Sequence, residues 1–333
     1  MNDLSLVTGG AGFIGSHVVD ALLASGSDVR VVDDFSTGRE ENLDGAWRLA
    51  AEHDAGLQVL AGDVRDEVRM RDAVDGCSSV VHLAAVPSVV QSVEDPVGCD
   101  SVTHGGTVNV LRQAVEAGAD RFVLASSCAV YGDAAELPIA EAGPARPLSP
   151  YAGAKLAAEE ICAEAADAGQ ITAVCLRFFN VYGPRQDPGS AYSGVISRFL
   201  AAAAAGHAVT VYGDGRQTRD FVYVADVVAA VLAALRRPLT GTSVLNVGTG
   251  REIDLLQIIS VVEDHAGRSL ERRIEAARDG DIRHSRADAG RARWVLGWEA
   301  GTTLDNGLAE TWAWFSGAGG PAEQAPPLGD ARA

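Results

Sequence analysis

The sequence is poor in positive charge. Against 27 Lys and Arg residues it carries 45 Asp and Glu residues, which gives a net charge of −18 and an isoelectric point near 4.7. Binding to nucleic acid or to anionic lipid requires a basic face. We therefore expect no nucleic-acid partner and no membrane partner, and an anionic ligand would have to be held by a few well-placed donors.

Cysteines and long apolar runs are also scarce. Residues 1–6 carry neither the basic region nor the apolar region of a signal peptide. No apolar run approaches the roughly 20 residues that span a bilayer. An odd number of cysteines without CxxC spacing indicates reduced thiols, and so we expect a cytoplasmic protein. These cysteines are Cys77, Cys99, Cys128, Cys162 and Cys175.

Short β-branched runs alternate with longer helical patterns through the first half of the chain. This alternation, without hairpin signals, predicts an α/β fold: a Rossmann-type, doubly wound parallel sheet with helices on both faces. The expected strands are Leu4–Thr8, Val29–Val32, Gln58–Ala61, Ser79–Leu83, Arg121–Ser126 and Thr172–Arg177. The expected helices are Ser16–Ser25, Glu67–Val74, Thr107–Ala117 and Pro150–Ala168.

A glycine-rich turn follows the first expected strand. Gly10, Gly12 and Gly15 form a GxGxxG pattern between a strand and a helix, where backbone N–H groups at a helix N-terminus can hold a pyrophosphate. Asp33 and Asp34 close the second strand, where a carboxylate would accept hydrogen bonds from an adenosine ribose and disfavour a 2′-phosphate. The pattern predicts NAD rather than NADP.

Beyond residue 180 the pattern of the sequence changes. Residues 183–190 are loop-like, and short elements with many charges follow, but Asp226–Arg236 reads as a helix and Ser243–Val247 as a strand of the first layer. We therefore predict an NAD-binding domain of residues 1–179 with about 221–250. A smaller, mostly C-terminal α/β lobe would comprise 180–220 and 251–315. A disordered tail is expected at 316–333.

A possible catalytic group follows the fifth expected strand. Tyr151 and Lys155 are four residues apart and share a face of one expected helix. We expect the lysine ammonium to lower the pKa of the phenol towards neutrality, so that Tyr151 can act as a general base. Ser126 and Ser127 end a buried strand in the crevice where doubly wound folds bind ligands. A YxxxK pair alone is common on protein surfaces; its position beside the serines favours catalysis.

These patterns together resemble the extended short-chain dehydrogenases/reductases. Within them the chain is similar to the nucleotide-sugar epimerase/dehydratase family, in the branch that contains UDP-glucose and UDP-N-acetylglucosamine 4-epimerases. The resemblance covers about residues 4–315. It rests on TGGAGFIG (8–15), VDDFSTG (32–38), HLAA (82–85), SVVQSVEDP (88–96), SSCAVYG (126–132), YAGAK (151–155), RFFNVYGPRQDP (177–188), YSGVISRF (192–199), RDFVYVAD (219–226) and DGDIRHSRAD (279–288).

The resemblance implies NAD as the cofactor and no metal. Asp33 would contact the adenosine ribose, Asp63 and Val64 the adenine, and Lys155 the nicotinamide ribose. The full set of implied cofactor residues is Gly9, Gly12, Phe13, Ile14, Gly15, Asp33, Asp34, Ser36, Thr37, Gly38, Asp63, Val64, Leu83, Ala84, Ala85, Tyr151, Lys155 and Phe178.

The resemblance also implies a UDP-sugar substrate and a 4-epimerase reaction through a 4-keto sugar. Ser127, Tyr151 and Lys155 would be catalytic, and Asn180 would bind the diphosphate. Ser285 stands where glucose-restricted members carry a bulky aromatic, which leaves room for a 2-acetamido group. The implied substrate residues are Ser88, Ser127, Cys128, Asn180, Arg185, Arg219, Arg278 and Ser285. Ser88 reads equally well as a helix cap.

Alternatives share the same 4-keto chemistry. Dehydratases of the family carry Asp-Glu after the catalytic hydroxyl, where this chain has Cys128 and Ala129, which disfavours 4,6-dehydration. A UDP-glucuronate epimerase or decarboxylase would commonly have Thr at Asn180, although Arg185 could pair with a carboxylate. A non-catalytic NAD-binding regulator is disfavoured by the intact catalytic residues.

The resemblance bears on assembly as well. The helices at about 104–118 and 151–168 resemble those that pair in a dimer interface, so we expect a homodimer. Thr103-His104-Gly105-Gly106-Thr107 departs from the family pattern, because the Asn that usually precedes Gly-Thr is replaced. We expect His104 to be a partly exposed helical residue and His82 to be a core residue.

Overall fold

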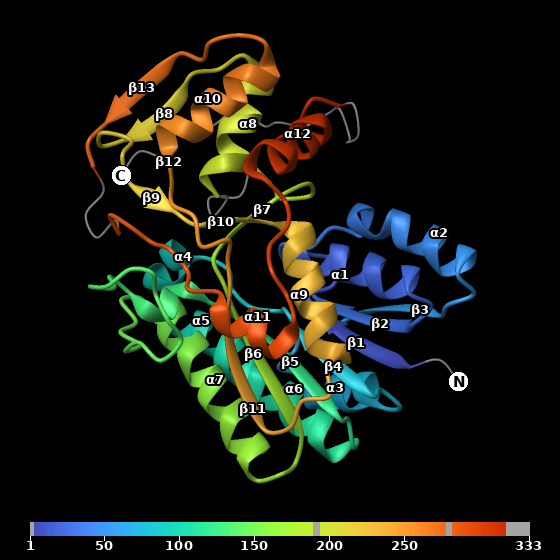
Figure 1. Ribbon diagram of the computed structural model, residues 1–333. Coiled ribbons are helices and arrows are strands. Elements are labelled where there is room, and N and C mark those ends of the chain that lie inside the picture. Colours follow the sequence, from blue (N-terminus) through green and yellow to red (C-terminus); the bar gives the residue numbers. More distant parts are fainter. Residues whose placement is uncertain (1–2, 189–193, 278–281, 318–333) are drawn as a thin grey trace.

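The computed structural model describes residues 3–188, 194–277 and 282–317. Its larger part is built on a seven-stranded sheet in the order β11-β6-β5-β4-β1-β2-β3, with every neighbouring pair parallel (Figure 1). The strands are β1 (Leu4–Thr8), β2 (Asp28–Asp33), β3 (Leu57–Ala61), β4 (Ser79–His82), β5 (Arg121–Ser127), β6 (Thr172–Phe178) and β11 (Thr242–Val247). The strand order reverses beside β1, as in a doubly wound sheet, and the expected fold class is confirmed.

Helices cover both faces of this sheet because successive side chains of a buried strand point to opposite sides. Val7 of β1 belongs to one apolar cluster and Leu6 to the other. On the side of Val7 lie α1 (Phe13–Ala24), α2 (Asp44–Glu52), α9 (Val224–Arg236) and α11 (Gly290–Leu296). On the side of Leu6 lie α3 (Glu67–Val74), α6 (Gly106–Glu116) and α7 (Pro150–Asp167).

The connection from β4 to α6 is helical along most of its length. It contains α4 (Val89–Glu94), α5 (Pro96–Asp100) and a π-helical turn, η2 (Ser101–Gly105), that runs directly into α6. Asp95 caps α5 by accepting from the Gly98 N–H, and Pro96 occupies its first turn. His104 lies within η2 and is partly exposed, as expected.

A smaller lobe lies beyond one end of the sheet (Figure 1). Its core joins side chains of three helices, among them Leu200, Ile258 and Leu308. Its elements are β7 (Asn180–Tyr182), α8 (Val195–Ala205), β8 (Val209–Tyr212), β9 (Thr218–Arg219), β10 (Phe221–Tyr223), β12 (Ile253–Asp254), α10 (Leu255–Ala266), β13 (Arg272–Glu275) and α12 (Leu304–Phe315). Strands β7 and β10 pair with each other, as do β9 and β12, and β8 and β13.

The structure describes only the beginning of the C-terminal tail, but all five cysteines. Of the expected tail at 316–333, only Ser316 and Gly317 fall within the described residues, and Ser316 closes α12. All five cysteines are described and free. Within the described ranges, no helix is both long and apolar enough to cross a membrane.

Candidate active site

The glycine-rich turn after β1 has room for backbone only. Gly9 has φ +69°, and a Cβ there would lie 2.8 Å from the Ala84 N atom. A Cβ at Gly10 would lie 2.7 Å from Val31 Cγ1, and Gly15 packs against the backbone of Gly9 and Gly10. The turn therefore brings the start of α1 directly against the ends of β1 and β4, as a pyrophosphate cradle requires.

The N-terminus of α1 is open to a ligand. Gly12 is its N-cap, and no side chain among the described residues caps it. Asp33 holds the turn in place, since its Oδ2 accepts from the Ala11 N–H and its Oδ1 from the Phe35 N–H, both at 2.9 Å. Burial raises the pKa of Asp33, while these hydrogen bonds act in the opposite direction. Asp34 accepts from the Ser36 N–H and hydroxyl.

One cavity of about 750 Å³ joins this cradle to the catalytic residues. Its size is typical of a site for a cofactor-sized molecule. The glycine cradle, the open helix end and the carboxylates at the end of β2 fit a dinucleotide with a free 2′-hydroxyl. The predicted residues that line the cavity are Gly9, Gly12, Phe13, Ile14, Gly15, Asp33, Asp34, Ser36, Thr37, Gly38, Val64, Leu83, Ala84, Ala85, Ser127, Tyr151, Lys155 and Phe178.

Two predicted residues lie in other surroundings than expected. Asp63 is paired with Arg65, an ion pair that lowers the pKa of the carboxyl, so an adenine contact would first require this pair to open. Arg185 was expected in the substrate site. It lines the cavity that also holds Ser127 and Tyr151, and its Nη2 donates to Asp20 at 2.7 Å, while its buried Nη1 has no hydrogen-bond partner among the described residues. The substrate role of Arg185 therefore stays a prediction.

The segment 183–188 closes one side of the cofactor cavity. His17 donates from Nε2 to the Pro184 carbonyl at 3.0 Å, and Arg39 donates to Asp187 at 2.6 Å. Together with the Asp20–Arg185 pair, these contacts join the segment to α1 and to the loop after β2. These contacts hold the segment in place along this side of the cavity.

The catalytic residues meet at the ends of β5 and α7. Ser149 caps α7 by accepting from the Ala152 N–H, which sets Tyr151 and Lys155 in its first two turns. The Ser127 hydroxyl accepts from the Ala129 N–H at 3.1 Å, and the Ser127 side chain acts to lower the pKa of the Tyr151 phenol. Lys155 is 4% exposed, and its Nζ donates to the Ala125 carbonyl at 2.7 Å. The structure thus brings Ser127, Tyr151 and Lys155 together.

The proton affinity of Tyr151 differs from the expectation. Burial raises the pKa of Tyr151 to about 12, although the Ser127 side chain acts in the opposite direction. Burial likewise lowers the pKa of Lys155 to about 8. The expected lowering of the phenol pKa by Lys155 is wrong for the protein alone, because desolvation is the largest influence and the ammonium is turned to a backbone carbonyl.

His82 is a satisfied core residue, as expected. It is 1% exposed, and its ring nitrogens contact the hydroxyls of Thr8 at 2.7 Å and Thr107 at 3.0 Å. Burial lowers the pKa of His82 to about 3, so the ring is neutral. It joins β1, β4 and α6 beneath the site.

Four of the predicted substrate residues, Cys128, Asn180, Arg219 and Ser285, lie at or near Asp220. The backbone N–H and side-chain Nδ2 of Asn180 both donate to the Asp220 carbonyl, and Ser285 donates its N–H to Thr218. Arg219 is the neighbour of Asp220, and the charges of both influence the Cys128 thiol, whose pKa burial raises to about 12. Arg278 lies outside the described residues.

Ser88 caps a helix in this structure. Its hydroxyl accepts from the Gln91 N–H at 2.9 Å at the start of α4, and the residue is 2% exposed. Of the two interpretations of Ser88, the helix cap is the one present in the structure.

Two buried carboxylates were missed from sequence. Asp220 is fully buried and accepts from the Thr249 N–H and hydroxyl, the Gly250 N–H and the Ala287 N–H. Glu159 is 4% exposed and pairs with Arg177. The signal for Asp220 was its place between Arg219 and an apolar strand; for Glu159 it was its position one turn after Lys155 on α7.

The doubly wound sheet, the phosphate cradle and the Ser-Tyr-Lys group define a dinucleotide-dependent enzyme of the short-chain dehydrogenase/reductase type. The model of the NAD dependent epimerase/dehydratase family matches residues 5–248. The chain belongs to this family, and its cofactor is NAD.

Individual relatives match nearly the whole chain. A UDP-glucose 4-epimerase of Mycolicibacterium smegmatis is 39% identical, covering 93% of this chain and 98% of its own. The structure of a Thermotoga maritima UDP-glucose 4-epimerase with UDP-glucose is 35% identical, with a TM-score of 0.88 and coverage of 95% and 99%. That of a Methanobrevibacter ruminantium UDP-N-acetylglucosamine 4-epimerase with UDP-N-acetylmuramic acid is 31% identical, with a TM-score of 0.89 and coverage of 96% and 100%.

Proposed function

We propose that the protein is an isomerase, an NAD-dependent UDP-sugar 4-epimerase. It interconverts UDP-glucose and UDP-galactose, and it also accepts the N-acetylhexosamine pair. The observation that carries the proposal is the single cavity that holds both the dinucleotide cradle and Ser127, Tyr151 and Lys155. Cys128 and Ala129 follow Ser127 in the short turn η3 (Cys128–Tyr131), and this pair lacks the carboxylates that elimination of water requires.

The chain's own residues would move the proton of the sugar 4-hydroxyl. The Tyr151 oxygen takes this proton, directly or through the Ser127 hydroxyl, and returns it after the sugar has presented its other face. Bound NAD⁺ would supply a hydride acceptor and, once reduced, a hydride donor at the sugar C4. Lys155 orients the nicotinamide ribose. Asn180 and Arg219 hold the UDP diphosphate, so the 4-keto sugar can turn without leaving.

The raised pKa of Tyr151 bears on when the base forms. In the protein alone the phenol is protonated at neutral pH, since its pKa is about 12. A phenolate needs positive charge close by, and the Lys155 ammonium supplies it below its own pKa of about 8. We infer that Tyr151 becomes a base only in the assembled complex with cofactor and substrate.

Product analysis tests the reaction. Incubation with UDP-glucose or UDP-N-acetylglucosamine, without added NAD, should yield the corresponding 4-epimer at unchanged mass, as seen by NMR and mass spectrometry. A panel of UDP- and dTDP-sugars fixes the nucleotide. Loss of water or of carbon dioxide would contradict epimerisation. In a parallel incubation with added NAD, so would NADH formed in proportion to that NAD.

Substrate range is tested at Ser285, which is 7% exposed. Ser285→Tyr should leave turnover of UDP-glucose within about threefold and lower kcat/KM for UDP-N-acetylglucosamine by about 100-fold, because the ring fills the space for the acetamido group. The matched control is Ser285→Ala, which keeps both activities. Equal effects of Ser285→Tyr on the two sugars would contradict this role.

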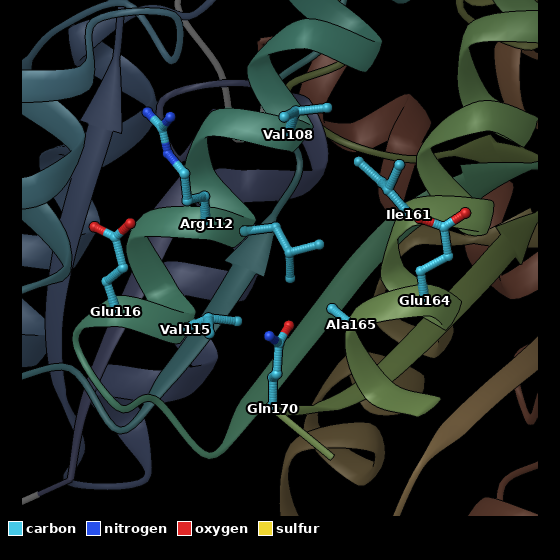
Figure 2. Close-up of a pocket in the computed structure, with 9 residues that line it drawn as sticks. Val108, Arg112, Val115, Glu116, Ile161, Glu164, Ala165 and Gln170 are labelled. Atoms are coloured by element: carbon cyan, nitrogen blue, oxygen red, sulfur yellow. The ribbon is translucent and has the colours of Figure 1, made fainter. Parts of the chain in front are cut away.

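We also infer a homodimer formed through α6 and α7. Figure 2 shows a groove between these two helices, with Val108, Arg112 and Val115 on one wall and Ile161 and Ala165 on the other. Val108 is 42% exposed. A second copy of the chain could seat its own α6 and α7 here, by the resemblance of these helices to a paired interface.

A charge placed in the groove tests the dimer. Val108→Glu should convert the protein from dimer to monomer in light scattering, because a carboxylate would be desolvated in an apolar interface. The control is Val68→Glu on α3, where the side chain is 58% exposed and a charge stays in solvent. A wild-type protein that is monomeric at micromolar concentration would contradict the inference.

The compartment is inferred from the thiols. All five cysteines are free and four are buried. Free thiols persist in reducing compartments, and we therefore infer that the enzyme acts in the cytoplasm.

A further inference from the structure

A buried polar cluster lies directly behind the catalytic residues. At its centre, the Glu159 carboxylate of α7 receives two N–H groups of Arg177 from β6, Nε at 2.9 Å and Nη2 at 2.6 Å. The same carboxylate accepts a hydrogen bond from the Ser126 hydroxyl at the end of β5. The side chains of Arg177 and Glu159 are 7% and 4% exposed. One carboxylate thus joins three elements that converge on the site.

The cluster extends to the turn after Ser127. The Arg177 guanidinium lies 4.8 Å from the centre of the Tyr131 ring, and the Tyr131 hydroxyl donates to Asn246 Oδ1 at 2.6 Å. Asn246 in turn is held by the Glu141 carboxylate and the Ile139 carbonyl. Hydrogen bonds of a buried network reinforce each other, so Glu159 is connected to the whole end of the sheet from β5 to β11.

Glu159 stands in line with the reacting groups. Tyr151, Lys155 and Glu159 occupy successive turns on one face of α7. Lys155 donates to the carbonyl of Ala125, and Glu159 accepts from the next residue of β5, Ser126. Two neighbouring residues of the strand are therefore fastened to two neighbouring turns of the helix. This arrangement fixes how far α7 can slide along β5.

We propose that Glu159 is a positioning residue for the 4-epimerase reaction: by holding Ser126 and Arg177 it sets the register of α7 against β5, and with it the placement of Tyr151 and Lys155 opposite Ser127. The inference rests on the proposed function and adds a residue to that site. Desolvating an ion pair brings little net stability when apolar side chains could fill the same space. Glu159 lies one helical turn from Lys155, and we therefore assign the Glu159–Arg177 pair a role in positioning rather than in stability.

Glu159 also influences the charge of Lys155. Burial lowers the pKa of Lys155, whereas Glu159 on α7 and Cys99 on α5 raise it. The other titratable neighbours are Tyr151 on α7 and His82 on β4, whose ring is neutral. Glu159 itself faces Arg177 and Cys175 of β6 and Tyr131 of η3. Removing the negative charge at Glu159 should thus favour the neutral lysine.

Two variants separate charge from register. Glu159→Gln keeps the shape and an acceptor for Ser126 but loses the charge; the alkaline limb of the kcat–pH profile should move to lower pH by about one unit. The double variant Glu159→Leu/Arg177→Met removes both charges and leaves neither unpaired. Its kcat at the optimum should fall about 100-fold, because the catalytic groups lose their spacing, with KM within about threefold and NAD still bound.

A matched control removes an ion pair far from the site. Glu263→Leu/Arg272→Met deletes the pair that joins α10 to β13, with atoms 3.2 Å apart, and should leave kcat and its pH profile unchanged. Turnover is expressed per NAD-loaded protein, and thermal unfolding is followed for every variant.

The outcomes are distinct. A double variant with kcat within about threefold of wild type would overturn the proposal. It would also be overturned if folded protein were lost while the remaining NAD-loaded molecules kept the wild-type kcat and the wild-type alkaline limb, because the cluster would then serve stability alone. Wild-type protein that does not epimerise any nucleotide sugar would instead contradict the proposed function, and this inference would fall with it.

Discussion

Replacing Tyr151 with phenylalanine is expected to lower kcat about 10³-fold while the protein keeps its NAD. The phenylalanine ring retains the packing of Tyr151 in the first turn of α7 but lacks the oxygen that exchanges a proton with the sugar. Loss of a positioned acid–base group typically costs between about 10² and 10⁴ in rate. Turnover is measured by NMR with UDP-glucose, and bound NAD is measured by its absorbance after the protein is denatured.

The control is Tyr223, a tyrosine that does not line the cavity. Tyr223 donates its hydroxyl to Glu310 in the smaller lobe, at 2.5 Å. Tyr223→Phe removes a comparable hydroxyl and should keep kcat within about twofold. Turnover by Tyr151→Phe within tenfold of wild type would contradict the assignment of the base.

Substituting Gly9 with alanine is expected to yield protein largely free of NAD. The residue has φ +69°, and the added Cβ would lie 2.8 Å from the Ala84 N atom and 3.0 Å from Ala84 Cα, both backbone atoms in the wall of the cofactor cavity. That wall must shift, so NAD affinity should fall about 100-fold, equivalent to roughly 2.7 kcal/mol. The measurement is the NAD content of purified protein, followed by titration with NAD.

Gly26 separates backbone strain from the loss of space. It has φ +79° after the far end of α1, and a Cβ there meets no described atom within 4 Å. Gly26→Ala should cost about 1 kcal/mol of folding free energy, through its positive φ, and leave NAD bound. Full NAD occupancy in Gly9→Ala would show that the turn does not form the cradle.

The sheet could be predicted because its signals are local. Each of the six strands expected before residue 180 is present within one residue at either end, and helix Glu67–Val74 has the expected bounds. Buried parallel strands are apolar runs, which are easily recognised. The helices that were missed have weaker patterns. α2 begins within a polar stretch, α5 contains Pro96 and Gly98, and α8 ends in a run of alanines.

Residue types in the site could be predicted, but their electrostatics could not. Motif spacing identified Ser127, Tyr151 and Lys155, and the cavity brings all three together. The direction of the Tyr151 pKa shift was wrong, since desolvation depends on what surrounds the phenol in space. The pairing of Arg185 with Asp20 could likewise not be predicted, because the two residues are far apart in sequence.

The smaller lobe is not a continuous segment of the chain that could be removed on its own. The chain leaves the sheet after β6, returns through β10 and α9 to add β11 at the edge, and leaves again at β12. A fragment that stopped at residue 179 would lack β11 and expose the backbone edge of β6. Such an edge can pair with the edge of another molecule and cause aggregation. To transfer the sugar preference of one relative to another, two segments of the chain, one before and one after β11 in the sequence, must therefore be exchanged together.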